Sequence, residues 1–281
     1  MNAKWDTGIF MFKKLLLAAI FCNLFVFMYS ADPQSFIDSG NAKFAADDYK
    51  GAIEDFNKAD VLGSADPVMA YTRGMAYYNL EEYKFAIGSF SAAISLKPDY
   101  SDAYIGLSDA QLKSGDPKAA IDTLNRVIKI IPVAAEPYVK RGLAIIATGD
   151  IKGSLPDFDK AISLAPKNSD AYCGRGIAKE ELNDIQGAII DLTKAIDLNK
   201  SNKTACLHSA GIKTALKDYK GAIKDFNRAI ELDPKNAEAY FNRGLAKDGK
   251  GDREGAIDDI TTAGDMGYEK AYAVLKQFHN N

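Results

Sequence analysis

The sequence has 281 residues, of which 47% are apolar and 26% are charged, a composition typical of a folded globular protein. Its formal net charge is −3, and Lys and Arg do not gather into a basic cluster. A slightly acidic chain of this kind is a poor nucleic-acid binder, so we expect no nucleic-acid partner.

The N-terminal segment, residues 1–31, has the pattern of an export signal. Lys13 and Lys14 precede an apolar run over residues 15–31, and a basic stretch followed by an apolar run is typical of a secretory signal peptide. The run is short for a membrane span, which takes about 20 apolar residues. We therefore expect an exported protein, either periplasmic, associated with the cell envelope, or secreted.

Cleavage is expected after Ala31, which leaves a mature chain that begins at Asp32. The bulky Tyr29 lies where a cleavage site usually carries a small residue, so an uncleaved N-terminal membrane anchor is the alternative. Met11 is an alternative start, because the ten residues before it contribute nothing that a signal needs.

From Pro33 to Lys270 the sequence repeats with a period of 34 residues, seven times and without insertion. Each copy holds two stretches with helical periodicity separated by turn residues, which is the organisation of helix-turn-helix solenoids. A solenoid grows by stacking, so the length does not imply several globular domains. With positions counted from 1 to 34, the copies begin at Pro33, Pro67, Ser101, Ala135, Ser169, Lys203 and Ala237.

Several positions of the repeat keep a fixed side-chain size. Positions 8, 20 and 27 are small, which allows the backbones of neighbouring helices to approach closely; larger residues would overpack the contact at a cost of about 1–3 kcal/mol. Position 4 is aromatic in Phe36, Tyr104, Tyr138, Tyr172 and Tyr240. The large residues at position 24, expected to fill the space between helices, are Phe56, Phe90, Leu124, Phe158, Leu192, Phe226 and Ile260.

With these residues the sequence resembles the tetratricopeptide repeat (TPR) family, whose pattern has an aromatic residue at position 4, Gly at 8, Ala at 20, a large residue at 24, Ala at 27 and Pro at 32. The resemblance covers residues 33–270. It implies an all-α fold in which seven pairs of antiparallel helices stack into a right-handed α-solenoid, or superhelix. Residues 271–281 continue as an amphipathic stretch with Tyr272, Leu275 and Phe278 on one face, which predicts a C-terminal capping helix.

Proline placement agrees with these helix boundaries. Pro33 and Pro67 each follow an Asp, the arrangement of an Asp N-cap with Pro in the first turn. Pro156 differs, because it lies at position 22, inside the second helix of the fourth copy. It removes a backbone hydrogen bond there, so we expect that helix to be kinked. The prolines at position 32, between copies, are Pro98, Pro132, Pro166 and Pro234.

The sequence offers no pattern for catalysis or metal binding. Neither of its two histidines, His208 and His279, has a Cys, Asp or Glu partner at metal-ligand spacing. Phosphate-binding, dinucleotide-binding and hydrolase motifs are missing from the sequence. We therefore expect no enzymatic activity, no cofactor, no metal and no small-molecule substrate.

Cys173 and Cys206 lie at positions 5 and 4 of neighbouring copies. In an oxidising compartment they could form a disulfide. Position 5 is expected on the concave surface and position 4 in the interior, so the preferred interpretation is two small buried residues.

Position 7 is Arg in four of the seven copies, and position 23 is Asp in five. The third copy lacks both, with Leu107 and Thr123 instead, and this parallel loss predicts structural Arg–Asp pairs between helices. A row of arginines that binds phosphate or carboxylate is the alternative. The arginines are Arg73, Arg141, Arg175 and Arg243, and the aspartates are Asp55, Asp157, Asp191, Asp225 and Asp259.

The first helix of each copy has two stripes, because each residue turns a helix by about 100°. Positions 4, 8 and 11 share the buried face, whereas positions 2, 5, 9, 12 and 13 form a second stripe. In the family that this sequence resembles, the second stripe lines the concave groove and contacts ligands. It is largely aliphatic in the fourth copy, with Val139, Leu143 and Ile146, and acidic further on. Its densest aromatic surface lies in the first two copies, and the predicted partner-binding residues are Ile37, Asn41, Phe44, Tyr71, Met75, Tyr78, Asn79, Ile105 and Asp109.

These observations predict an exported, non-enzymatic scaffold that binds a protein or peptide partner in the concave groove. A membrane-tethered structural or assembly factor of the cell envelope is the alternative, and a regulatory subunit of an enzyme is a further one. Contact with a membrane is expected only if residues 15–31 are not cleaved.

Overall fold

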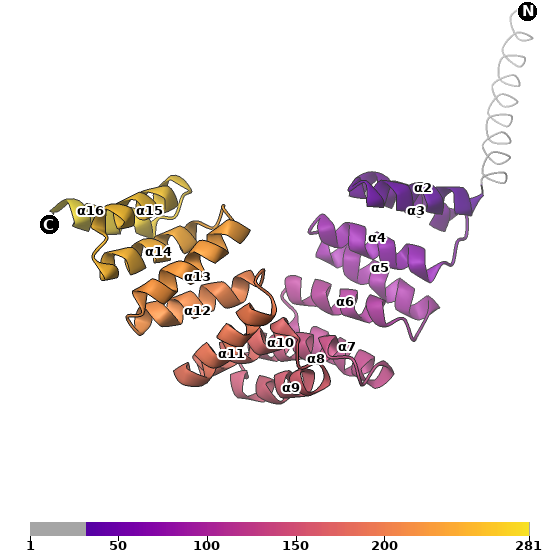
Figure 1. Cartoon of the computed structure of the whole chain (residues 1–281). Coiled ribbons are helices and arrows are strands. Elements are labelled where there is room, and N and C mark those ends of the chain that lie inside the picture. The colour runs from indigo at the N-terminus through magenta and orange to yellow at the C-terminus, as the bar shows by residue number, and fades with distance from the viewer. Residues whose placement is uncertain (1–31, 281) are drawn as a thin grey trace, which may run out of the picture. The chain divides into compact units, whose positions relative to one another are not determined.

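The structure is a computed structural model that describes residues 32–280. The predicted signal segment, residues 1–31, lies outside this range. All regular elements among the described residues are α-helices, which confirms the all-α prediction (Figure 1). They are α2 (Pro33–Ala45), α3 (Tyr49–Val61), α4 (Pro67–Asn79), α5 (Tyr83–Leu96), α6 (Ser101–Lys113), α7 (Pro117–Ile130), α8 (Glu136–Ala147), α9 (Ile151–Leu164), α10 (Ser169–Glu181), α11 (Ile185–Leu198), α12 (Lys203–Ala215), α13 (Tyr219–Leu232), α14 (Ala237–Lys250), α15 (Arg253–Asp265) and α16 (Lys270–Asn280).

Each 34-residue copy provides one even-numbered helix followed by one odd-numbered helix, called here its first and second helix. The chain divides into two compact units, one ending at Asp116 and the other beginning at Pro117. Unit 1 contains α2–α6 and unit 2 contains α7–α16. Within each unit, consecutive helices pack against each other, as a solenoid requires.

Most second helices begin in the same way. In α9 the carboxylate of Asp150 accepts a hydrogen bond of 2.9 Å from the amide of Gly153, which satisfies one of the free amides at the helix N-terminus. A Cβ at Gly153 would lie only 2.1 Å from Asp150 Oδ2, so this cap requires glycine. The same Asp and Gly, three residues apart, begin α3, α11, α13 and α15.

The core is built on the residues at position 24. Phe158 has no exposed surface and packs between two glycines of successive first helices, Gly142 in α8 and Gly174 in α10. A Cβ would lie 2.7 Å from the Phe158 ring at Gly142 and 2.3 Å from it at Gly174, so neither site has room for a side chain. The small residue at position 8 was predicted to allow close packing between helices. The role of the glycine at position 6 in the same packing was not predicted.

First helices form the inner layer of each unit. Those of neighbouring repeats contact each other, α2 with α4 and α4 with α6 in unit 1, and α8, α10, α12 and α14 in succession in unit 2. Successive second helices contact each other at most marginally. The first helices therefore line the inner side of the curve within each unit, which is where the predicted binding stripe lies.

The C-terminal helix α16 packs against α15 and covers a cluster around Ile260. Ala271 is fully buried, and Leu275 and Phe278 pack against the same cluster. The prediction that Tyr272 shares this buried face is wrong, because Tyr272 is 59% exposed and only its hydroxyl reaches back, donating to the Gly264 carbonyl at 2.9 Å.

Pro156 lies within α9, which runs without interruption from Ile151 to Leu164. Its side chain is exposed, so the ring faces solvent and does not disturb the core. The expected kink stays a prediction.

Candidate functional site on the first helices

In unit 1 the predicted binding residues divide by exposure. Asn41 and Asn79 are exposed, and Phe44, Met75 and Ile105 are half-buried. Ile37 was expected on the groove surface but is only 5% exposed and packs in the core beside Phe56, so it offers a ligand no surface.

The aromatic rings of the predicted hot spot pack partly against their own unit. Tyr71 lies 5.7 Å from Phe90 and 5.2 Å from Tyr100 between ring centroids, and it stays half-buried. Tyr78 forms an edge contact with Tyr83 at 5.5 Å. These rings therefore support the fold as well as presenting an edge to solvent.

Two of the predicted residues from different repeats influence each other. Burial raises the pKa of Tyr78, and the negative charge of Asp109 raises it further. The phenol at the end of α4 thus lies within electrostatic reach of a carboxylate on α6. Both side chains are half-buried, so this pair gives the inner face of unit 1 a hydrogen-bonding group beside a negative charge.

In unit 2 the same stripe lines a cavity of about 430 Å³ across α8, α10 and α12. Leu143, at position 9 of the fourth repeat, gives it an exposed apolar side chain, whereas Val139 at position 5 is only 5% exposed and adds little surface. Asp170 and Glu136, both at position 2, supply negative charge. Amides and Lys140, which pairs with Glu136 at 3.7 Å, also line it, so the cavity is a short trough of mixed polarity.

Cys173 lies in the wall of this cavity, and it and Cys206 are both free and buried. Burial raises the pKa of the Cys173 thiol to about 12, with a smaller contribution from Asp170. The thiol is therefore protonated at neutral pH and does not act as a nucleophile. Both cysteines thus follow the preferred interpretation as small buried residues.

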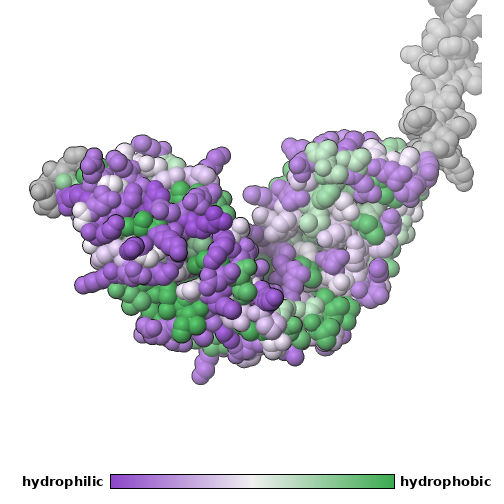
Figure 2. All heavy atoms as spheres, viewed as in Figure 1, coloured by the Kyte–Doolittle hydropathy of each residue, from purple (hydrophilic) through white to green (hydrophobic). Residues whose placement is uncertain are grey.

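A second cavity, of about 330 Å³, continues the inner face over α10, α12 and α14. Glu180 and His208 meet in its wall, with Nδ1 of the histidine 2.7 Å from Oε2 of the glutamate. Glu238 and Asn242 add another carboxylate and an amide. Figure 2 shows hydrophilic residues dominating the visible face of this unit, with hydrophobic patches between them.

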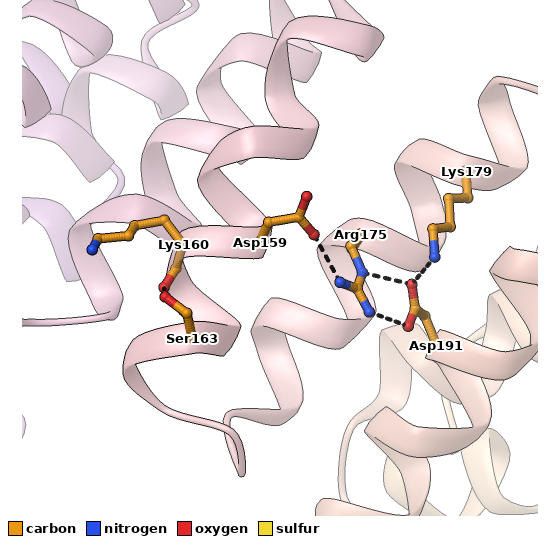
Figure 3. A network of polar contacts seen from close by, with 6 residues as sticks. All are labelled: Asp159, Lys160, Ser163, Arg175, Lys179 and Asp191. Carbon is orange, nitrogen blue, oxygen red and sulfur yellow. Dashed lines mark hydrogen bonds and ion pairs between the residues drawn. The ribbon is translucent and has the colours of Figure 1, made fainter.

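The arginines at position 7 form structural pairs, as predicted. Arg175 holds Asp191 with two hydrogen bonds, Nε to Oδ2 at 2.8 Å and Nη2 to Oδ1 at 2.7 Å (Figure 3). Lys179 at position 11 donates to the same carboxylate at 2.7 Å. Burial raises the pKa of Asp191, but the hydrogen bonds from Arg175 and Lys179 outweigh it, and the net shift is downward. Arg141 with Asp157 and Arg243 with Asp259 repeat the two-bond arrangement.

Each of these arginines has a further partner that the sequence interpretation missed. Nη1 of Arg175 donates to Asp159 of the preceding repeat at 2.7 Å (Figure 3). Arg141 reaches Asn125 at 2.7 Å, and Arg243 reaches Asn227 at 2.8 Å. The three partners all lie at position 25, so the arginine ties each repeat to the one before it.

Repeats without this arginine–aspartate combination pair differently. Arg73 keeps the contact with position 25 of the preceding repeat, here Asn57, and it pairs with Asp60 of that repeat, since Ser89 occupies position 23 of its own. Asp55 has Ser39 at position 7 instead of arginine, and it accepts hydrogen bonds from that serine and from lysines.

Neither a metal centre nor a membrane span emerges from the described part of the chain. Residues 32–280 contain no group of three or more His, Cys, Asp or Glu side chains arranged to hold a metal ion. None of the helices in that range is both long enough and apolar enough to cross a membrane.

Solved structures with the same fold are repeat proteins. The MamA protein is 26% identical over 61% of this chain and 94% of its own, with a TM-score of 0.50. A tetratricopeptide repeat protein from Parabacteroides merdae is 19% identical over 88% and 98%, with a TM-score of 0.69. YrrB, described as a TPR protein with an unusual peptide-binding site, is 22% identical over 66% and 97%, with a TM-score of 0.51. None of the curated proteins matches the sequence.

Family models match three stretches of the sequence that together span about half of it. The model described as TPR repeat matches residues 212–251, and two models described as tetratricopeptide repeat match residues 77–144 and 169–202. These matches agree with the paired helices, the small residues between them and the solved structures of the same fold. The chain belongs to the tetratricopeptide repeat family.

Proposed function

We propose that this protein is an exported, non-enzymatic scaffold that binds an extended segment of a partner protein along the inner face of its first helices. The observation that carries the proposal is the cavity of about 430 Å³ across α8, α10 and α12. It is lined by the same repeat positions of successive repeats, so its chemistry is laid out in a line, as an extended peptide requires. The solved structure of YrrB supports the proposal by analogy, since its description names a peptide-binding site on the same fold.

The chemistry of this face favours a partner segment with apolar side chains and basic residues. Leu143 is 42% exposed on the trough wall and Val68, at position 2 of the second repeat, is 53% exposed. Exposed apolar side chains on a binding face act as contact anchors. The carboxylates of Asp170 and Glu238 favour basic groups nearby, whereas Glu136 is already paired with Lys140.

The binding face can be tested with charge substitutions that spare the core. We expect Leu143→Glu, in the cavity of unit 2, to weaken partner binding by about tenfold or more, since an anchor contributes about 2 kcal/mol, and Val68→Glu tests the first helices of unit 1 by themselves. The partner is first obtained by capture on the protein starting at Asp32, and its affinity for each variant is then measured by calorimetry. Helicity and melting temperature should be unchanged.

Matched controls lie on the second helices. Val61 in α3 is 70% exposed and Ile190 in α11 is 66% exposed. We expect Val61→Glu and Ile190→Glu to leave the affinity within about threefold of the original, as for rim contacts. If these two variants lose binding while Val68→Glu and Leu143→Glu keep it, the partner binds the second helices and the proposed binding face is wrong.

Export is the part of the proposal that rests on the sequence of residues 1–31. We expect the mature protein to begin at Asp32, because the basic and apolar stretches before it fit a cleaved signal. N-terminal sequencing of the protein purified from its native cells checks this. A chain that begins at Met1 or Met11 and pellets with membranes would favour the tethered alternative.

A further inference from the structure

A cavity of about 630 Å³ lies between α11, α12 and α13, and most of its walls belong to the second helices. It is therefore distinct from the two cavities on the inner face. Its position coincides with a departure of the sixth repeat from the pattern of its neighbours. That repeat has Ser209 at position 7 instead of arginine and Cys206 at position 4 instead of an aromatic residue.

The fifth repeat shows what normally occupies this space. The guanidinium of Arg175 lies 5.6 Å from the ring centroid of Tyr172 at position 4. It pairs with Asp191 at position 23 and with Asp159 at position 25 of the preceding repeat. Lys179 at position 11 shares the Asp191 carboxylate. Four positions thus surround the guanidinium.

The same four positions line the cavity around the sixth repeat. They are Cys206 at position 4, Lys213 at position 11, Asp225 at position 23 and Thr193 at position 25 of the preceding repeat. Ser209, at position 7, is too short to enter this space and is fully buried behind it. The cavity is thus the space of a missing tyrosine and a missing arginine.

Asp225 keeps an unused acceptor toward this space. The residue is only 7% exposed, and its Oδ2 accepts hydrogen bonds from Ser209 at 2.6 Å and Lys213 at 2.5 Å. No donor among the described residues reaches Oδ1. Oδ1 can still accept a hydrogen bond, and a guanidinium provides two donors in the geometry that a carboxylate accepts.

We propose that this cavity binds an arginine side chain of a partner polypeptide, whose guanidinium pairs with Asp225 as Arg175 pairs with Asp191. The occupant is larger than a guanidinium alone, because about 630 Å³ lies in the range of sites that enclose whole ligands, about 300–1,000 Å³. The proposal depends on the proposed function only in taking a polypeptide as the partner, and it concerns a different surface.

Three of the four basic residues around the cavity are paired with carboxylates of the lining, which leaves the exposed Lys224 as one excess positive charge. In the fifth and seventh repeats an arginine and a lysine already share one aspartate, so Lys213 on Asp225 leaves room for a guanidinium. At the rim, Lys200 pairs with Asp197 at 2.7 Å and Arg228 with Glu231 at 2.9 Å. Lys224 is the remaining basic residue of the lining and is exposed.

The test uses the protein starting at Asp32 and a capped peptide with the sequence Gly-Gly-Arg-Gly-Gly. We expect the peptide to bind in an NMR titration, with shifts confined to α11–α13, and the same peptide with citrulline to bind about tenfold or more weakly, because citrulline keeps the shape but loses the charge. Equal binding of both peptides overturns the proposal.

Three variants locate the site. Ser209→Arg supplies the missing guanidinium within the chain and should abolish peptide binding. Thr193→Trp, at an exposed position on α11, should do the same by blocking the mouth even if Ser209→Arg folds poorly. Tyr172→Cys combined with Arg175→Ser removes the same two side chains from the fifth repeat and should create a second site. Unchanged binding in the first two places the peptide elsewhere and overturns the proposal. Leu143→Glu should leave this binding intact, so a failure of the proposed function remains distinguishable.

Discussion

Phe158→Ala is expected to destabilise the protein by about 3–5 kcal/mol, the usual cost of removing a fully buried phenylalanine. The ring has no exposed surface and fills the space between Gly142 and Gly174, which have no side chains that could move into the cavity left behind. Urea denaturation followed by circular dichroism measures the loss. Hydrogen exchange should show that the loss of protection is largest in α8–α11.

Phe85→Ala is the matched control. Phe85 lies in α5 with 62% of its surface exposed, and it stacks on Tyr77 with 5.3 Å between ring centroids. Its removal should cost at most about 1 kcal/mol. A loss at Phe158 no larger than at Phe85 would mean that the residue at position 24 is not the centre of the repeat core.

Asp191→Asn is expected to cost about 3 kcal/mol, at the lower end of the range for breaking a buried ion pair by removing one partner. Asp191 is 2% exposed and accepts hydrogen bonds from Arg175 and Lys179. The amide cannot balance two cations, which remain partly buried. Denaturation at neutral pH measures the loss, because the carboxylate is fully ionised there.

Asp197→Asn provides the comparison on the same helix. Its pair with Lys200 is exposed on both sides, with relative side-chain exposures of 64% and 61%. Exposed pairs contribute about 0–1 kcal/mol, so this change should be nearly silent. Similar losses in both variants would show that the bridge of Arg175 does not stabilise the array.

The architecture was predictable because the side-chain sizes at fixed positions of the repeat determine which residues of neighbouring helices contact each other. Gly142 at position 8 lies on the first helix of the repeat and Phe158 at position 24 on the second. The two helices pack closely only if the large side chain lies over the glycine, so the positions alone fix how the helices face each other. The same logic predicted the pairing of Arg175 with Asp191, since both charges disappear together from the third repeat. The partner at position 25 was overlooked, although Asn125, Asp159 and Asn227 share that position and provided the signal.

The binding stripe was predicted less well. An angle of about 100° per residue gives the direction of a side chain around the helix, but not whether a side chain near the edge of the groove is exposed or buried. Position 5 lies at the edge between the groove and the interior. Ile37, Val139 and Cys173, which all occupy it, are each 5% exposed, whereas Tyr71 and Ile105 are half-buried. How far a side chain at this position is covered depends on its neighbours on the adjacent repeats, which helix periodicity alone does not give.

The hydrogen bonds between the arginine at position 7 and position 25 of the preceding repeat also influence the order in which the helices unfold. The stability of a repeat array is the sum of terms within repeats and terms between neighbours, so the weakest junction decides where cooperativity breaks. In unit 2, Arg141, Arg175 and Arg243 each add such a term, and Ser209 does not. The contact of His208 with Glu180 at the same junction is partly exposed and adds at most about 1 kcal/mol. Asn202, which caps α12, still donates to Ser169 and Asp170 of α10, so the missing bridge lowers but does not abolish the cost of separating α12–α16 from α8–α11.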